Sequence, residues 1–261
     1  MSTPLLISSH MLMLAYRSGI FPMADSRDDP EIFWVEPRLR AILPLDGFRL
    51  SRSLARTLRR GRFAVTCNAA FSEVIDACAE RRRDGEGSWI SHSIQASYEA
   101  LHALGTAHSI ECWQEDEQGR HQLVGGLYGV GFDGVFCGES MFSRQPDASK
   151  VALAWLVAAL RKAGAQLLDC QFMTSHLASL GAVEISQERY LTLLKQAQSG
   201  AAGASSSGVG VADGAGVAAG EGERRAGSLP EGFAALLEEA ASCGLSSSPG
   251  KRIAHFLTQT S

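Results

Sequence analysis

The stretch from Gly125 to Gln171 restricts the possible folds of this chain more than any other. Two apolar segments in it flank Asp133-Gly134, a dipeptide typical of a tight β-hairpin turn. A long apolar segment follows and ends at Gly164, as expected for a helix. Residues 167–171, Leu-Leu-Asp-Cys-Gln, predict a further strand. A hairpin, a helix and a strand in this order predict a helix packed against a mostly antiparallel sheet, an α+β fold.

The last of these strands carries two polar side chains where burial is expected. Because successive side chains of a strand alternate between its faces, Asp169 and Gln171 share one face. Burying a carboxylate and an amide without partners is unfavourable, so these side chains need something polar to pair with. We therefore take them as candidate functional residues.

The composition narrows the class of protein. A chain of 261 residues that is 45% hydrophobic and 20% charged can form one large domain or two small ones. A net charge of −4 does not indicate a generally basic nucleic-acid binder. The sequence has neither an apolar run long enough for a membrane span nor the pattern of a signal peptide. The six cysteines form no C-x-x-C pair, which argues against zinc and disulfides and favours reduced thiols in the cytoplasm.

The pattern of elements predicts four regions. Residues 1–46 form a small N-terminal α+β domain, in which a charged turn joins strands at 32–35 and 41–45 and Trp34 belongs to the core. Residues 47–198 form the larger domain, with helices flanking the sheet. Residues 199–228 are rich in Gly, Ala, Ser and Val and predict a disordered linker, because they cannot bury enough surface to offset chain entropy. Residues 229–261 form a C-terminal tail with a short helix.

One segment is strongly basic despite the negative net charge. Between Phe48 and Phe71 there is no acidic residue and there are six arginines. Four of them, Arg52, Arg56, Arg59 and Arg60, share one face of a predicted helix, and Arg62 follows closely. Phosphates are the usual anions that such a face binds, but a solvated surface explains the pattern equally well.

Nine short motifs then occur in an order that is typical of one enzyme family. They are A-Y-R-S-G-I-F-P (15–22), S-R-S (51–53), S-W-I (88–90), A-H-S-I-E (107–111), G-G-L-Y-G (125–129), G-E-S-M-F-S (138–143), D-A-S-K (147–150), L-D-C-Q (168–171) and L-G-A-V-E-I (180–185). Through them, residues 5–198 resemble the leucyl/phenylalanyl-tRNA–protein transferases. Two features depart from the family pattern: Met23 stands where many relatives have Trp, and residues 199–228 are additional.

This resemblance implies an aminoacyltransferase that moves Leu or Phe, and Met less well, from aminoacyl-tRNA to the N-terminal Lys or Arg of a protein. The modified protein would then enter N-end rule degradation in the bacterial cytoplasm. The resemblance also implies a larger domain like that of the N-acetyltransferases (GNAT-like), with no cofactor and no metal. We expect a monomer whose partners are Leu-tRNA, Phe-tRNA and acceptor proteins, and no association with a membrane.

The resemblance also implies roles for particular residues. Asp169 would orient or deprotonate the attacking amine, Gln171 would relay or position it, and Glu139 would attract the basic acceptor. The pocket for the transferred side chain would be apolar, with Trp89 near the terminal adenosine, and Arg52, Arg56, Arg59, Arg60 and Arg62 would take the phosphates of the acceptor stem. The expected pocket residues are Leu127, Phe136, Met141, Leu156 and Leu168, each of which can equally be plain core.

Two other classes of function remain open on the sequence. The first is an acyl-CoA-dependent N-acyltransferase of the same fold, which normally needs a glycine-rich loop for pyrophosphate. The corresponding loop, residues 142–149, has no glycine, and Asp147 would repel that anion. The second is a non-enzymatic RNA-binding protein, which leaves Glu139, Asp169 and Gln171 without a role.

Overall fold

The computed structural model describes residues 6–80, 87–202, 227–245 and 248–259. The helices are α1 (Ser9–Arg17), α2 (Arg52–Arg59), α3 (Phe71–Ala79), α4 (His92–Ala103), α5 (Ala148–Lys162), α6 (Ser175–Ser179), α7 (Gln187–Ala202), α8 (Leu229–Ser242) and α9 (Gly250–Thr258). The strands are β1 (Phe21–Met23), β2 (Phe33–Val35), β3 (Leu39–Ile42), β4 (Ala64–Cys67), β5 (Ala107–Glu115), β6 (His121–Phe132), β7 (Val135–Ser143), β8 (Leu167–Gln171) and β9 (Val183–Ser186).

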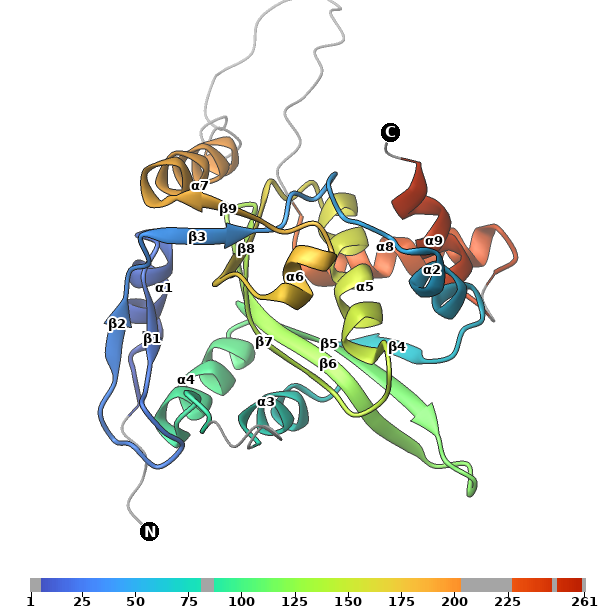
Figure 1. The fold of residues 1–261 in the computed structure, drawn as a ribbon, viewed down its shortest axis with the longest axis horizontal. Coiled ribbons are helices and arrows are strands. Elements are labelled where there is room, and N and C mark those ends of the chain that lie inside the picture. Colours follow the sequence, from blue (N-terminus) through green and yellow to red (C-terminus); the bar gives the residue numbers. More distant parts are fainter. Residues whose placement is uncertain (1–5, 81–86, 203–226, 246–247, 260–261) are drawn as a thin grey trace, which may run out of the picture.

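A seven-stranded sheet in the order β4-β5-β6-β7-β8-β3-β9 forms the centre of the molecule (Figure 1). Its neighbouring strands are antiparallel except β7 and β8, which run parallel. Helix α5 lies against one face, and α3 and α4 cover the other. The expected α+β fold with a mostly antiparallel sheet and flanking helices is therefore confirmed.

The hairpin and the helix predicted between Gly125 and Gln171 are both present. Asp133 and Gly134 have φ angles of 45° and 75°, the left-handed pair that a two-residue turn of this kind needs. Helix α5 is buried along nearly its whole length and ends before Gly164, whose φ is 74°. The apolar run of this helix is thus explained by burial between the sheet and the C-terminal helices.

Strands β7 and β8 pair over only part of their length. The ladder joins residues 135–137 to residues 167–169 and then stops, although both strands continue. Gln171, at the end of β8, has a φ of 61°, which bends the backbone away from regular strand geometry. Beyond Cys137 the two strands are no longer paired, and Gly138 and Gln171 at this opening line a cavity.

The N-terminal region differs from the expectation. The strand predicted at 32–35 corresponds to β2, whereas the one predicted at 41–45 overlaps β3 only at residues 41–42. The two are not joined as a pair: β2 pairs with β1 in a separate two-stranded sheet, whereas β3 pairs with β8 and β9. Trp34 is 39% exposed, so it is not a core residue. The boundary at residue 46 stays a prediction, with β3 belonging to the large sheet.

The C-terminal region is more ordered than the prediction of a tail. Residues 199–202 continue α7 and are not part of a linker, since extending an existing helix adds one hydrogen bond for each residue fixed. At the other end of the predicted linker, Gly227 donates to the Ala163 carbonyl at 2.7 Å and Ser228 caps α8, whereas residues 203–226 lie outside the described residues. Helix α8 packs along α5, and α9 packs on α2 and α5. In the described part of the chain, no helix is long and apolar enough to cross a membrane.

Candidate active site

A cavity of about 470 Å³ lies where β7 and β8 separate. Five of the six residues predicted to bind the substrate line it: Leu127, Met141, Leu156, Leu168 and Trp89. Leu153 and Leu177 add to the apolar wall, and Glu139 and Gln171 supply polar groups. An apolar pocket with a few convergent polar groups is the usual form of a small-molecule site.

Phe136 is the predicted pocket residue that the structure places elsewhere. It is 1% exposed and lies closer to the hairpin turn, where it lines a different cavity together with Gly131 and Leu160. A Cβ on Gly129 would lie 2.5 Å from the Phe136 ring, so this ring fills the space that the missing side chain leaves. Phe136 is therefore a core residue.

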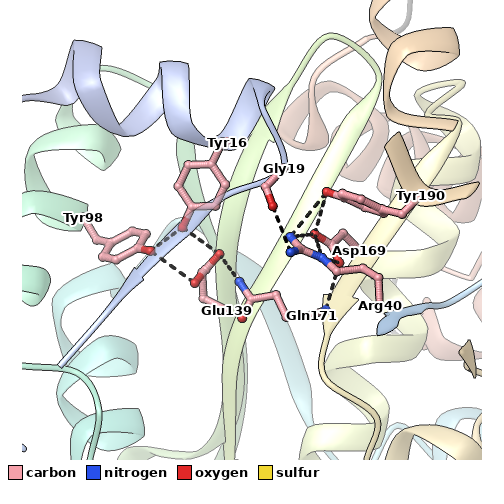
Figure 2. A network of polar contacts seen from close by, with 8 residues as sticks. All are labelled: Tyr16, Gly19, Arg40, Tyr98, Glu139, Asp169, Gln171 and Tyr190. Carbon is pink, nitrogen blue, oxygen red and sulfur yellow. Dashed lines mark hydrogen bonds and ion pairs between the residues drawn. The ribbon is translucent and has the colours of Figure 1, made fainter. Parts of the chain in front are cut away.

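Glu139 stands at the polar end of the cavity and is held by three donors (Figure 2). Its Oε1 accepts hydrogen bonds from the Tyr16 hydroxyl and from Gln171 Nε2, both at 2.8 Å. Its Oε2 accepts from the Tyr98 hydroxyl at 3.1 Å, and the two tyrosine hydroxyls also contact each other. Burial raises the pKa of Glu139 from 4.5 to about 7, although these hydrogen bonds oppose the shift.

Asp169 is fully buried and forms an ion pair with Arg40. The Arg40 Nη2 to Asp169 Oδ2 distance is 2.6 Å, and Arg40 Nε lies 2.9 Å from Oδ1. The Tyr190 hydroxyl also donates to Oδ2 at 3.0 Å. Asp169 does not line the cavity, so the expectation that it touches the attacking amine does not agree with its position. A buried carboxylate needs a full set of partners, and here a guanidinium supplies them.

Gln171 connects the two carboxylates. Its backbone N–H donates to Asp169 Oδ1 at 2.8 Å, and its side chain donates to Glu139. Its left-handed backbone is unfavourable for a residue other than glycine by about 1–3 kcal/mol. The hydrogen bond to Asp169 holds this conformation, and so Asp169 fixes where the Gln171 amide lies. The role expected for Gln171 in positioning the amine stays a prediction.

Sequence reasoning missed four residues of this network: Tyr16, Tyr98, Arg40 and Tyr190. A tyrosine on the buried face of a helix needs a partner for its hydroxyl, and Tyr98 met that condition. Arg40 lies in an otherwise apolar segment of β3, which also calls for a buried partner. The partner, Asp169, lies 129 positions further along the chain, so no local sequence pattern identifies it.

The five predicted tRNA-binding arginines lie in or next to α2. Its Ser51 cap accepts a hydrogen bond from the Leu54 N–H at 3.2 Å, and Leu54 and Leu58 face the core. All five arginines are exposed, namely Arg52, Arg56, Arg59, Arg60 and Arg62. Among the described residues, the first four have no ion-pair partner.

The chain matches two family models along most of its length. The model described as leucyl/phenylalanyl-tRNA protein transferase matches residues 42–195, and that of the N-terminal domain of the same family matches residues 6–38. Helices α8 and α9 lie beyond the last matched residue.

Curated relatives named leucyl/phenylalanyl-tRNA–protein transferase agree with these matches. One from Novosphingobium aromaticivorans is 64% identical over 99% of this chain and 98% of its own length. One from Rhizorhabdus wittichii is 58% identical over 77% of this chain and 79% of its own, and one from Ruegeria sp. is 52% identical over 73% and 87%. With these matches, the chain belongs to the leucyl/phenylalanyl-tRNA protein transferase family, a family of aminoacyl-transferring enzymes.

Proposed function

We propose that this protein transfers Leu or Phe, and Met less well, from aminoacyl-tRNA to the N-terminal Lys or Arg of acceptor proteins. The observation that carries the proposal is the apolar cavity that ends at Glu139 and Gln171. Its leucine-rich wall suits an apolar aminoacyl side chain. Its polar end suits the ester carbon and the amine that attacks it.

The chemistry requires a positioned amine more than a strong catalyst. An α-amine attacks the ester carbonyl to form a C–N bond, the C–O bond to the ribose breaks, and the proton lost by the amine ends on the ribose oxygen, which leaves as a hydroxyl. The Gln171 amide oxygen can accept a hydrogen bond from the amine, while one N–H of its Nε2 donates to Glu139 and fixes the orientation of the amide. Glu139 has a pKa of about 7, so near neutral pH it exists in both protonation states and can exchange a proton with the amine.

Asp169 acts in this proposal as a positioning residue. Its charge is compensated by Arg40, and it acts on the substrate only through the Gln171 backbone. The negative charge of ionised Glu139 favours the basic side chain and the ammonium of an N-terminal Lys or Arg. The exposed arginines of α2 would take phosphates of the acceptor stem.

The wider setting is also part of the proposal. Labelling of N-terminal Lys or Arg would direct proteins to N-end rule degradation in the cytoplasm, with the enzyme acting as a monomer. The unpairing of β7 and β8 after a short parallel stretch supports a GNAT-like larger domain. An acyl-CoA donor is not favoured: the loop before α5 has no glycine, and Asp147 there forms an ion pair with Lys150 and contacts Thr57.

A transfer assay tests the proposal. Radiolabelled Leu from Leu-tRNA should label a peptide that begins with Arg and not a matched peptide that begins with Glu. Acetyl-CoA in place of Leu-tRNA should label neither. Equal labelling of both peptides would contradict the specificity proposed for Glu139. Acylation by acetyl-CoA would show that the acyl donor is a thioester and not an aminoacyl-tRNA.

A further inference from the structure

Helices α2 and α9 lie against each other and share an unusual composition (Figure 1). Neither helix contains Asp or Glu, although the chain has a net charge of −4. α2 contributes Arg52, Arg56 and Arg59, and α9 contributes Lys251 and Arg252. Two adjacent helices without acids concentrate positive charge on one part of the molecule.

The contact between these helices is close and fixed. Gly250, the first residue of α9, is buried, and a Cβ there would lie 2.2 Å from the Leu58 carbonyl oxygen of α2. The Ser248 hydroxyl donates to the Arg59 carbonyl at 3.4 Å. Ile253 and Leu257 belong to the same apolar core as Leu58. α9 therefore holds a defined position beside the arginines of α2.

The cations on this pair of helices differ in how they are compensated. Arg252 lies 3.2 Å from Glu239 of α8, which also pairs with Lys162. Lys251 is exposed and, in the ranges that the structure describes, has no ion-pair partner. Asp147 contacts Thr57 of α2 but forms its ion pair with Lys150, so among the described residues Lys251 and the α2 arginines have no ion-pair partner. Several unpaired cations on one surface repel one another until an anion binds.

We propose that α9 is the second helix of the tRNA-binding surface, on which Lys251 contacts a backbone phosphate beside those bound by α2. The proposal rests on the proposed function, and it assigns a role to a helix that lies beyond the range of the family match. A row of single cations suits the phosphates of a stem, which position an RNA without reading its sequence. It suits the base-reading of single strands less well.

Charged-tRNA affinity at several salt concentrations tests the proposal. The variants are Lys251→Ala, Arg56→Ala and, as a matched control, Lys195→Ala on the exposed side of α7. For Lys251→Ala we expect severalfold weaker binding at low salt and a log–log salt slope flatter by roughly 0.7–0.9. Lys195→Ala should give the wild-type curve. Transfer from a minimal aminoacyl-adenosine donor, which lacks the stem, should be unchanged in both lysine variants.

The outcomes of these measurements distinguish a failure of the inference about α9 from a failure of the proposed function. If Arg56→Ala flattens the salt curve and Lys251→Ala does not, α9 is outside the tRNA surface and the proposed function stands. A higher KM for the acceptor peptide with unchanged tRNA affinity in Lys251→Ala would assign the surface to protein acceptors and overturn the inference. No transfer by the wild-type enzyme from Leu-tRNA would overturn the proposed function itself.

Discussion

Glu139 and Asp169 are both buried carboxylates, yet their surroundings give them different properties. Asp169 has a guanidinium as its main partner, with which it forms a buried ion pair. Glu139 has only neutral donors, two phenols and an amide, so burial in a low-dielectric environment dominates. Of the two, Glu139 is therefore the group suited to exchange a proton near neutral pH.

This difference predicts a pH-dependent stability that depends on Glu139. The native state holds the Glu139 proton up to a pKa of about 7, whereas the ordinary value is 4.5. Since the native state then binds more protons, the free energy of unfolding should fall as pH rises between these values, by up to about 3 kcal/mol. Glu139→Gln cannot titrate and should lose less stability over the same interval.

Urea unfolding at pH 5 and pH 8 measures this effect in wild type and variant. Other titrating groups are common to both proteins and cancel in the difference between them. Glu80→Gln is a suitable control, because Glu80 pairs with Arg144 on the surface and its side chain is 62% exposed. Identical pH dependence in wild type and Glu139→Gln would mean that Glu139 is already ionised at pH 5 in the folded protein.

Helices and strands that depend on neighbouring residues in the sequence could be predicted, whereas strand pairings between distant residues could not. The β6–β7 hairpin and α5 could be predicted, because a turn dipeptide, apolar periodicity and a terminal glycine are local signals. The four-residue strands β4 and β9 carry no such signal, and β3, where a strand is predicted from residue 41, finds its partners β8 and β9 far along the chain. Their pairing depends on tertiary packing, which no short window contains.

The same reasoning explains which site residues were found. Glu139, Gln171 and most of the pocket lie in the central stretch, where the motifs are dense. Tyr16, Arg40 and Tyr190 come from α1, β3 and α7, and only the fold brings them to β7 and β8 (Figure 2). Asp169 was correctly singled out as a buried polar residue that needs a partner. The partner was a guanidinium from β3.

The contact of α9 with α2 gives a prediction at this scale. In Gly250→Ala the new methyl group would lie 2.2 Å from the Leu58 carbonyl, a backbone atom that cannot turn aside. α9 must then move away from α2, and we expect a loss of stability of about 1–3 kcal/mol. Gly244→Ala is not a neutral control, because Gly244 has a φ of 70°.

Melting temperature and charged-tRNA affinity of Gly250→Ala together check this expectation. Ala254→Gly, which removes a methyl group from the buried face of the same helix, serves as the comparison for a change without a clash. An unchanged melting temperature in Gly250→Ala would show that α9 shifts freely on α2, which contradicts a fixed contact.

For the whole molecule, the C-terminal helices complete the core. Trp155 of α5 packs on Phe233 of α8 with ring centroids 5.1 Å apart, and Gly232 lies against the Ala159 backbone. Helix α5 is therefore enclosed by the sheet on one side and by α8 and α9 on the other. The largely apolar sequence of α5 is explained by burial on both of these sides.

Removal of α8 and α9 should consequently destabilise the entire protein. A chain that ends after residue 202 loses the large buried apolar side chains of α8 and α9 and exposes the outer face of α5; they are Leu229, Phe233, Leu236, Ile253 and Leu257. Each buried side chain of this kind contributes about 1.5–3 kcal/mol, and typical domains are stable by only about 5–15 kcal/mol. We therefore expect the truncated chain to aggregate or to melt far below the full chain.

A chain that ends after residue 245 keeps α8, and its melting temperature should fall between those of the other two chains. Differential scanning calorimetry of the three chains measures the order. Equal melting temperatures would show that α5 is stable against the sheet alone, and the contacts of Phe233 and Trp155 would then be incidental to folding.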